Sequence, residues 1–280
     1  MQPSSSYITA SDLALDRHRA SPENKGVIYR EALFGDVHFS ALTVRENAKD
    51  FGKPAGRYLS IAFPSPALWS KEEEEELLLA VRLAIRVFFK SPPRRLLIAG
   101  LGNRRLTADS LGPLVAERVN ATASLPEAIF ARFGVPIDTR VAICAPDVFS
   151  KTGIESVRTV EAASRLFDAD ALLAFDALAT SEKERLLRVI ELTDTGTVPG
   201  GGVKQGKEAL TAATLGIPTV AVGVPTVVRA DAEHFLVPRD LEEGIFAIAS
   251  LLSHAVDLAF HGDAPNADFS IQELFVSEEL

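Results

Sequence analysis

Hydrophobic and polar positions in the first part of this 280-residue chain follow β-type and then helical spacing. Two β-rich runs over residues 27–44 are separated by Phe34-Gly35-Asp36, which predicts a β-hairpin. Residues 56–63 predict a third strand that prolines close. Apolar residues then recur at helical spacing, and we expect a helix that Ser70 caps and that runs to about Lys90.

The second half of the chain alternates short apolar runs with stretches of helical spacing. Buried strands are predicted at residues 95–102, 141–146, 171–177, 187–192 and 218–224. Helices are predicted from about Leu111 and over residues 155–167, 207–216 and 241–262. This alternation predicts an α/β fold with a mostly parallel sheet covered by helices on both faces, preceded by the N-terminal β-hairpin region. Residues 1–25 are polar and poorly periodic, and we expect an extended or mobile arm.

Composition and charge narrow the classes of function. Hydrophobic residues make up 47% of the chain and charged residues 24%, as in globular proteins. The net charge of −9 argues against direct binding of nucleic acid, which needs a basic face. The single cysteine, Cys144, permits no intrachain disulfide and fits a reducing compartment. With no secretory apolar core and no apolar run of about 18 residues, we expect a soluble cytoplasmic protein without a membrane segment.

Two aspartates stand out because each follows an apolar run. Asp109 lies in the loop after residues 95–102, and Asp176 emerges from the strand at 171–177. Catalytic groups of an open α/β sheet gather beyond the carboxyl ends of its strands, so two carboxylates there suggest shared acid and base chemistry. A buried carboxylate such as Asp176 must be paired, hydrogen-bonded or protonated. For Asp109, capping of the following helix is an equally good interpretation.

Other chemistries are less well supported by the sequence. Gly100-Leu101-Gly102 follows a strand, but Arg105 stands where a dinucleotide fingerprint needs glycine, so Gly102 and Asn103 predict a tight turn that aims the next loop. Asp194-Thr195-Gly196 resembles the triplet of pepsin-like proteases, yet it follows a strand of an α/β pattern; Asp194, with Thr195 and Gly196, stays a candidate for lining the site. The histidines lack metal-ligand spacing and Cys144 lies in an apolar strand, so we expect no metal and no cofactor.

Several longer motifs together resemble the spore germination endopeptidases, the proteases that degrade small acid-soluble spore proteins. These motifs are GLGNRRLTADSLGP, KTGIES, FDALA and TDTGTVPGGGV…KEALTAATLGIPTVAVGVPTVV, and the resemblance covers roughly residues 7–230 in order. It implies an α/β fold related to the hydrogenase-maturation proteases and an aspartic-type peptidase unlike pepsin in fold. It also implies a zymogen that assembles into a homotetramer in the forespore or spore core and removes its own N-terminal arm. The essential aspartates of the family fall on Asp109 and Asp176.

The N-terminal arm is similar to the processing site of that family. Residues 7–14 read YITASDLA, with an acidic residue before an apolar one, so the resemblance predicts a cut between Asp12 and Leu13. An ordinary disordered terminus is the alternative. We therefore expect a propeptide-like arm at 1–12 and one peptidase domain at 13–280, with a β-rich part at 13–93 and an α/β core at 94–262.

Departures from the family pattern and two other functions stay open. Asp147 stands where the family has glycine, and it either alters titration near the site or lies on the surface. A non-catalytic binding or assembly protein on the same fold is one alternative function. A hydrogenase-maturation-type protease is the other, although no histidine occurs in the motifs for its metal-sensing trio.

Overall fold

The computed structural model describes residues 11–48, 50–89, 91–126, 128–129, 139–200, 208–229, 234–261 and 271–275. Its described strands are β1 Val27–Phe34, β2 Val37–Val44, β3 Gly56–Ala62, β4 Arg95–Gly100, β5 Arg140–Cys144, β6 Ala171–Thr180, β7 Val189–Thr193, β8 Thr219–Arg229 and β9 Phe235–Leu236. Its described α-helices are α2 Ala14–Ala20, α3 Lys71–Phe88, α4 Leu111–Arg118, α6 Phe149–Thr152, α7 Ser156–Phe167, α8 Ala212–Leu215 and α9 Leu241–His261. Short 3₁₀ helices lie at Pro66–Leu68 (η1), Thr107–Asp109 (η2), Lys183–Arg185 (η3) and Ile271–Phe275 (η4).

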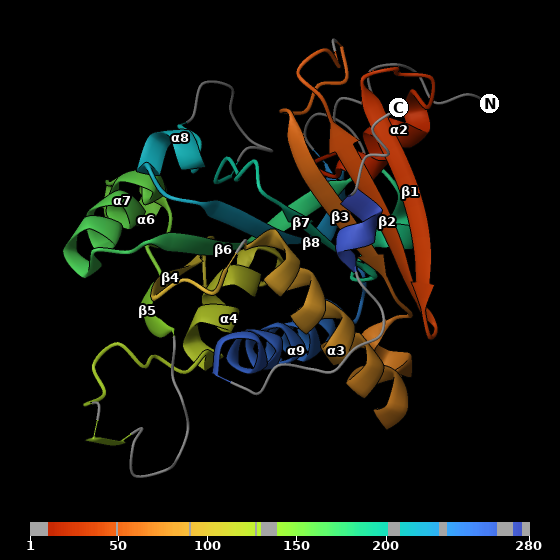
Figure 1. Cartoon of the computed structure of the whole chain (residues 1–280). Helices are drawn as coiled ribbons and strands as arrows, with labels where there is room; N and C mark the ends of the chain where they lie inside the picture. The colour runs from red at the N-terminus through yellow and green to blue at the C-terminus, as the bar shows by residue number, and fades with distance from the viewer. Residues whose placement is uncertain are drawn as a thin grey trace.

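All the described strands belong to one sheet at the centre of the molecule (Figure 1). Their order is β1-β2-β3-β7-β8-β6-β4-β5, and β9 pairs with β8. The α/β prediction is confirmed, but parallel pairing is confined to β5, β4, β6 and β8. The hairpin β1–β2 continues antiparallel through β3 to β7, and β7 also pairs antiparallel with β8. The sheet is therefore mixed, because β7 joins the predicted N-terminal strands to the parallel core.

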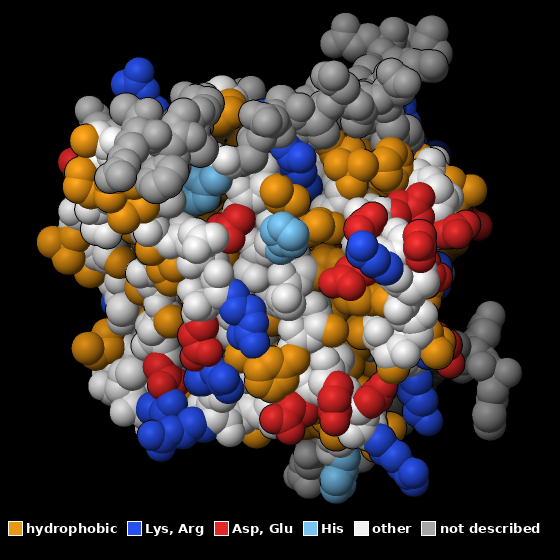
Figure 2. Space-filling model, turned by 90° about the horizontal axis from the view of Figure 1, so that it is seen from below, with side chains coloured by type: hydrophobic (Ala, Val, Ile, Leu, Met, Phe, Trp, Pro, Cys, Tyr) orange, Lys and Arg blue, Asp and Glu red, His pale blue; other side chains and the backbone are white. Residues whose placement is uncertain are grey.

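Helices cover both faces of the sheet, as the sequence predicts. Below the sheet in Figure 1, α3, α4 and α9 pack against the largest hydrophobic cluster, which includes Ile98 and Phe175. On the opposite face, Val157 and Val160 of α7 pack on Leu97 and other alternate strand residues. Figure 2 shows the outer side of the α3–α4–α9 layer, where acidic and basic side chains are interspersed with scattered hydrophobic ones. Period-two alternation along the strands thus divides the core into two layers.

Helix α9 is the one described helix that is long and apolar enough to cross a membrane by length and composition. In the molecule it is a core helix, with 61% of its most apolar window buried. It contacts α3 and α4 along its length.

The sequence predicts several element boundaries well and misplaces others. Ser70 caps α3 through a capping box with Glu73, as expected for a serine before an acidic first turn. Residues 11–25 are not an extended arm, because α2 lies there and its Ala14 and Leu15 pack against Leu42 and Tyr58.

Two predicted helices are shorter in the structure. Only α8 forms within residues 208–216, because Leu210 pairs with Thr197 and Thr211 is the N-cap, and Lys207 lies outside the described residues. Helix α4 ends at Arg118, where the chain leaves for β5, and Thr122 donates its N–H to the carbonyl oxygen of Val141.

Candidate active site

Asp176 lies in the middle of the parallel part of the sheet. It belongs to β6, which pairs with β4 on one side and β8 on the other, and its register partner in β8 is Gly223. The residue is only 6% exposed. The N–H of Ala177 donates a hydrogen bond of 2.9 Å to Oδ1 of Asp176. The carboxylate is therefore held at a fixed position near the carboxyl ends of β4 and the neighbouring strands.

Asp109 is brought to the same region by the loop after β4. It ends η2, and its Oδ2 accepts a hydrogen bond of 2.9 Å from the N–H of Asn103. The hydroxyl of Thr226 in β8 donates to the carbonyl oxygen of Ala108 at 2.6 Å, which ties η2 to the sheet. The N-cap of α4 is Ser110, whose side chain makes no capping hydrogen bond. Asp109 is therefore not the N-cap that the capping interpretation requires, and its carboxylate accepts a hydrogen bond within its own loop.

Two glycines allow this loop to approach the strand ends closely. A Cβ added to Gly112 at the start of α4 would lie 2.3 Å from the carbonyl oxygen of Leu101 and 2.4 Å from that of Phe175. A Cβ added to Gly102, whose φ is +113°, would lie 2.2 Å from the carbonyl oxygen of Asp109. Both contacts are with backbone atoms, which cannot turn away as a side chain can. Any larger residue would push the Asp109 loop away from β4 and β6.

Asp109 and Asp176 line the same cavity, which has a volume of about 740 Å³. Its wall also includes Lys53, Glu191 and Thr226, together with residues of β8 and β9. A space of this size accommodates a ligand comparable to a short peptide segment. The structure therefore brings the two carboxylates that the sequence singled out to one cavity, and it adds polar residues that sequence reasoning missed, among them Lys53, Glu191 and Thr226.

The other residues predicted for the site divide into two groups. Thr195 and Gly196 line the cavity, whereas Gly102 and Asn103 act behind it by contacting Asp109. Asp194 is not among the described residues that line the cavity. Its carboxylate accepts two 2.7 Å hydrogen bonds from Arg57, one from the backbone N–H and one from Nε. The guanidinium of Arg57 also donates to the carbonyl oxygens of Val87 and Phe88, so Asp194 fastens β7 to β3 and the end of α3.

Asp147 lies at the surface and does not line the cavity. The ammonium of Lys151 hydrogen-bonds its carboxylate and holds the pKa of Asp147 below its ordinary value. Lys151 also donates to the side-chain oxygen of Asn103 at 3.3 Å. Among the described residues, no cluster of three His, Cys, Asp or Glu side chains is arranged to hold a metal ion.

The first described residues of the chain enter the same cavity. Asp12 lines it, and its backbone N–H donates to the carbonyl oxygen of Ala179 at 2.8 Å. The N–H of Ala179 in turn donates to the carboxylate of Asp12, also at 2.8 Å. The ammonium of Lys53 contacts the carbonyl oxygen of Asp12, and the next residue, Leu13, is fully buried. The predicted cut after Asp12 thus falls where the chain passes from the cavity wall into the core.

Glu191 is a buried carboxyl group between this segment and the sheet. It is 4% exposed, and its oxygens accept hydrogen bonds of 3.1 and 2.9 Å from the N–H of Ala14 and one of 3.3 Å from the hydroxyl of Ser60. Burial raises the pKa of Glu191 from 4.5 to about 7, against the opposing effect of the Lys53 ammonium. An acid inside the apolar run of β7 was the signal in the sequence that could have revealed it.

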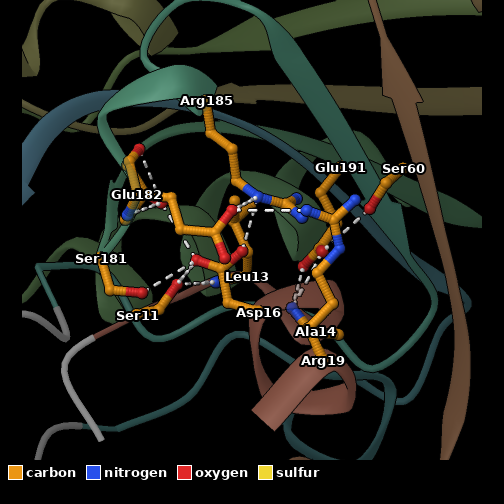
Figure 3. A network of polar contacts seen from close by, with 11 residues as sticks. Ser11, Leu13, Ala14, Asp16, Arg19, Ser60, Ser181, Glu182, Arg185 and Glu191 are labelled. Carbon is orange, nitrogen blue, oxygen red and sulfur yellow. Dashed lines mark hydrogen bonds and ion pairs between the residues drawn. The ribbon is translucent and has the colours of Figure 1, made fainter. Parts of the chain in front are cut away.

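A second buried acid holds helix α2 against the body of the protein. Nε of Arg185 lies 2.8 Å from Oδ1 of Asp16, and their side chains are 6% and 4% exposed. The hydroxyls of Ser11 and Thr180 donate to Oδ2 of Asp16. Figure 3 shows Ser11, Asp16 and Arg185 pointing toward one another, with the carboxylate of Glu182 at the same Nε of Arg185. Residues 11–16 are thus fixed by buried charges on both sides.

Comparison with known proteins gives this geometry a family. The sequence profile described as germination protease matches residues 7–235. The chain belongs to the germination protease family. A germination protease of Clostridium perfringens (strain ATCC 13124) is 32% identical over 233 residues, which are 80% of this chain and 71% of that protein. One of Bacillus mycoides (strain KBAB4) is 33% identical over 279 residues, covering 89% of this chain and 73% of the relative.

Because it belongs to the germination protease family, this chain is a peptidase. Among solved structures, a [NiFe] hydrogenase maturation protease, HycI, from Thermococcus kodakarensis is similar with a TM-score of 0.40 and 19% identity. That similarity covers 62% of this chain and 99% of the other.

Proposed function

We propose that this germination protease is an endopeptidase that degrades small acid-soluble spore proteins during germination, with Asp109 and Asp176 as its catalytic pair. The observation that carries the proposal is the single cavity that both carboxylates line together with Asp12. Peptide-bond hydrolysis is inferred from the family, and the cavity has room for a peptide beside the two acids. The net charge of −9 suits a protein substrate that is taken free of DNA.

The reaction needs one carboxylate and one carboxylic acid. The ionised aspartate accepts a proton from a water molecule, whose oxygen attacks the carbonyl carbon of the substrate. The protonated aspartate donates its proton to the nitrogen of the leaving amine as the C–N bond breaks. This division of roles requires the two carboxyl groups to lie within reach of one water molecule, since like charges that close disfavour ionisation of one another.

The same cavity supports self-processing of a zymogen. Asp12 occupies its wall, so the chain carries an acidic residue in the space that a substrate would need. Cutting between Asp12 and Leu13 would release the arm and clear that wall. The proposal includes a homotetramer located in the cytoplasm of the forespore or spore core, in keeping with the family resemblance.

Intact mass and N-terminal sequencing after incubation between pH 5 and 8 test this function. The wild-type chain is expected to acquire Leu13 as its first residue and then to cleave a purified small acid-soluble spore protein. Asp109→Asn and Asp176→Asn should each lower both rates by about 10²–10⁴. Asp168→Asn is the matched control, because that side chain is 76% exposed, pairs with Arg95 and does not line the cavity.

The outcomes distinguish loss of the catalytic pair from general damage to the fold. Full activity in Asp176→Asn would refute the paired mechanism. Loss of activity in Asp168→Asn as well would show that asparagine substitutions damage the protein in general.

A further inference from the structure

A single hydroxyl group, that of Ser11, links the backbone nitrogen of Leu13 to the buried carboxylate of Asp16. Its N–H donates to the hydroxyl oxygen of Ser11 at 3.1 Å, and that hydroxyl donates to Oδ2 of Asp16 (Figure 3). All three residues are buried. Ser11 therefore stands between the Leu13 nitrogen and the Asp16 carboxylate, and it belongs to the segment that precedes the predicted cut.

A second buried carboxylate lies on the other side of the same backbone. Glu191 accepts the N–H of the next residue, Ala14, with both of its oxygens. Successive backbone nitrogens are less than about 4 Å apart, so the Leu13 nitrogen is close to this carboxyl as well. The cations of this region are already engaged, since Arg185 is shared between Asp16 and Glu182 and Lys53 contacts the Asp12 carbonyl. Two acids from different elements thus lie near the Leu13 nitrogen, Asp16 through the hydroxyl of Ser11 and Glu191 through the N–H of the adjacent Ala14.

We propose that Asp16 and Glu191 form a binding site for the free α-amino group of Leu13, and that this site locks the processed chain. The inference rests on the cut after Asp12 proposed above. Hydrolysis adds the hydroxyl of water to the carbonyl carbon of Asp12 and a hydrogen to the nitrogen of Leu13. The new amine takes up a further proton from solvent and becomes an ammonium with three donors and one positive charge. Loss of residues 1–12 removes the Ser11 hydroxyl, and the ammonium takes its place on Asp16.

The chemistry of the site fits such a cation. A buried carboxyl without a dedicated partner favours its neutral form, whereas an ammonium within hydrogen-bond distance favours the ionised one. The charged groups that surround this segment are Asp16 on α2, Glu191 on β7, Lys53 on the loop before β3, and the Arg185–Glu182 pair at η3. The pairing would hold α2 in position after the arm that precedes it has left. Cleavage at the cavity would thus be followed by an ion pair that fixes the new N-terminus of the processed protein.

The reactivity of the amine tests the site directly. A removable fusion replaces residues 1–12, and its protease is used on the folded protein so that Leu13 becomes the first residue. The control is the same chain with one glycine before Leu13, which displaces the amine by one residue. Carbamylation by cyanate at pH 7.5, followed by peptide mass spectrometry, measures how much of the α-amine is neutral and accessible. The chain that begins with Leu13 should react at least tenfold more slowly than the glycine-extended chain.

Two further measurements make the result decisive. Glu191→Gln should recover at least part of the lost reactivity, and the α-amine of the unsubstituted chain should titrate at a higher pH than that of the control. Equal reactivity of the two chains would overturn the proposal, and so would a Leu13 chain that no longer unfolds cooperatively. The carbamylation test uses an engineered terminus and so does not depend on self-processing. If the full chain never processed itself, the proposed zymogen would be contradicted, but the amine-binding result would still hold.

Discussion

Replacing Glu191 with glutamine should remove a pH dependence of stability that burial of this carboxyl creates. Burial raises the pKa of Glu191 to about 7, and the Asp16 carboxylate adds to the rise. The ammonium of Lys53, the N–H of Ala14 and the hydroxyl of Ser60 favour the ionised form and oppose it. In the unfolded chain the carboxyl is in water and returns to its ordinary value of 4.5.

The size and sign of the effect follow from these two values. A rise from 4.5 to about 7 corresponds to roughly 3 kcal/mol at about 1.36 kcal/mol per unit. Since the folded state holds the proton more tightly, the stabilisation is complete below pH 4.5. It is lost as the pH rises toward 7 and is absent above that. Wild type should therefore lose about 3 kcal/mol of unfolding free energy relative to Glu191→Gln across this window.

Urea unfolding at half-unit steps from pH 4.5 to 8 measures the difference. Taking wild type minus variant at each pH cancels the other titrating groups that the two proteins share, including Asp147. The difference should fall through pH 5–7 and level off near pH 7.5. Parallel curves for the two proteins would refute the reasoning, because they would mean that Glu191 has the same pKa in the folded and unfolded states.

Three substitutions test the contacts that build the site. Gly112→Ala should cost about 2–3 kcal/mol and most of the peptidase activity, because its Cβ meets two backbone oxygens; thermal unfolding and peptide cleavage measure both. Arg185→Met should cost about 3–5 kcal/mol in urea unfolding at pH 7, because it leaves the carboxylate of Asp16 buried without its cation. Thr226→Val should cost about 1–3 kcal/mol and lower activity, because the carbonyl oxygen of Ala108 loses its donor.

Matched controls separate these contacts from general damage. Gly153→Ala adds a Cβ that meets nothing within 4 Å, so only its left-handed backbone should cost about 1–2 kcal/mol. Arg165→Met removes a cation from an exposed pair with Glu161 and should cost less than about 1 kcal/mol. If Gly112→Ala were no worse than Gly153→Ala, the close approach of α4 to the strand ends would not be what positions Asp109.

Local signals in the sequence predict much of the fold. The turn at Gly35, the capping box at Ser70 and the apolar runs of β4, β6 and β8 each depend on residues close together in the chain. Helix α2 was missed because its first residue follows Leu13, which gives no side-chain cap, and because its packing partners lie on β2 and β3. The strand β7 was predicted, but its antiparallel pairing was not, because one short apolar run does not reveal which strands it pairs with.

In the candidate site too, residues marked by local sequence signals could be predicted, and residues placed by tertiary pairing could not. Asp109 and Asp176 could be found because each follows an apolar strand, and strand ends meet at one edge of a sheet. Lys53 could not, because it reaches the cavity from a loop far from the motifs. Glu191 left one signal, an acid inside an apolar run, but the position of its antiparallel strand beside the cavity could not be predicted. Asp194 is the opposite case. Its triplet resembles a catalytic motif, but its carboxylate forms an ion pair with Arg57. Motif resemblance predicted the catalytic pair, and tertiary pairing determined which other polar residues surround it.

The N-terminal segment joins the two buried acids to the cavity that Asp109 and Asp176 line. Asp12 forms two hydrogen bonds with Ala179, which lies on β6 three residues beyond Asp176, so the segment is bound to the same strand as Asp176. Two and four residues further along the chain, Ala14 and Asp16 are held by Glu191 and Arg185. The proposed cut between Asp12 and Leu13 would leave these buried contacts of Ala14 and Asp16 in place while it releases the preceding segment from the cavity wall. The intact segment has its two ends held differently, with Asp12 on the cavity wall and Asp16 on a buried arginine, so the site of the cut separates the part that would leave from the part that would stay.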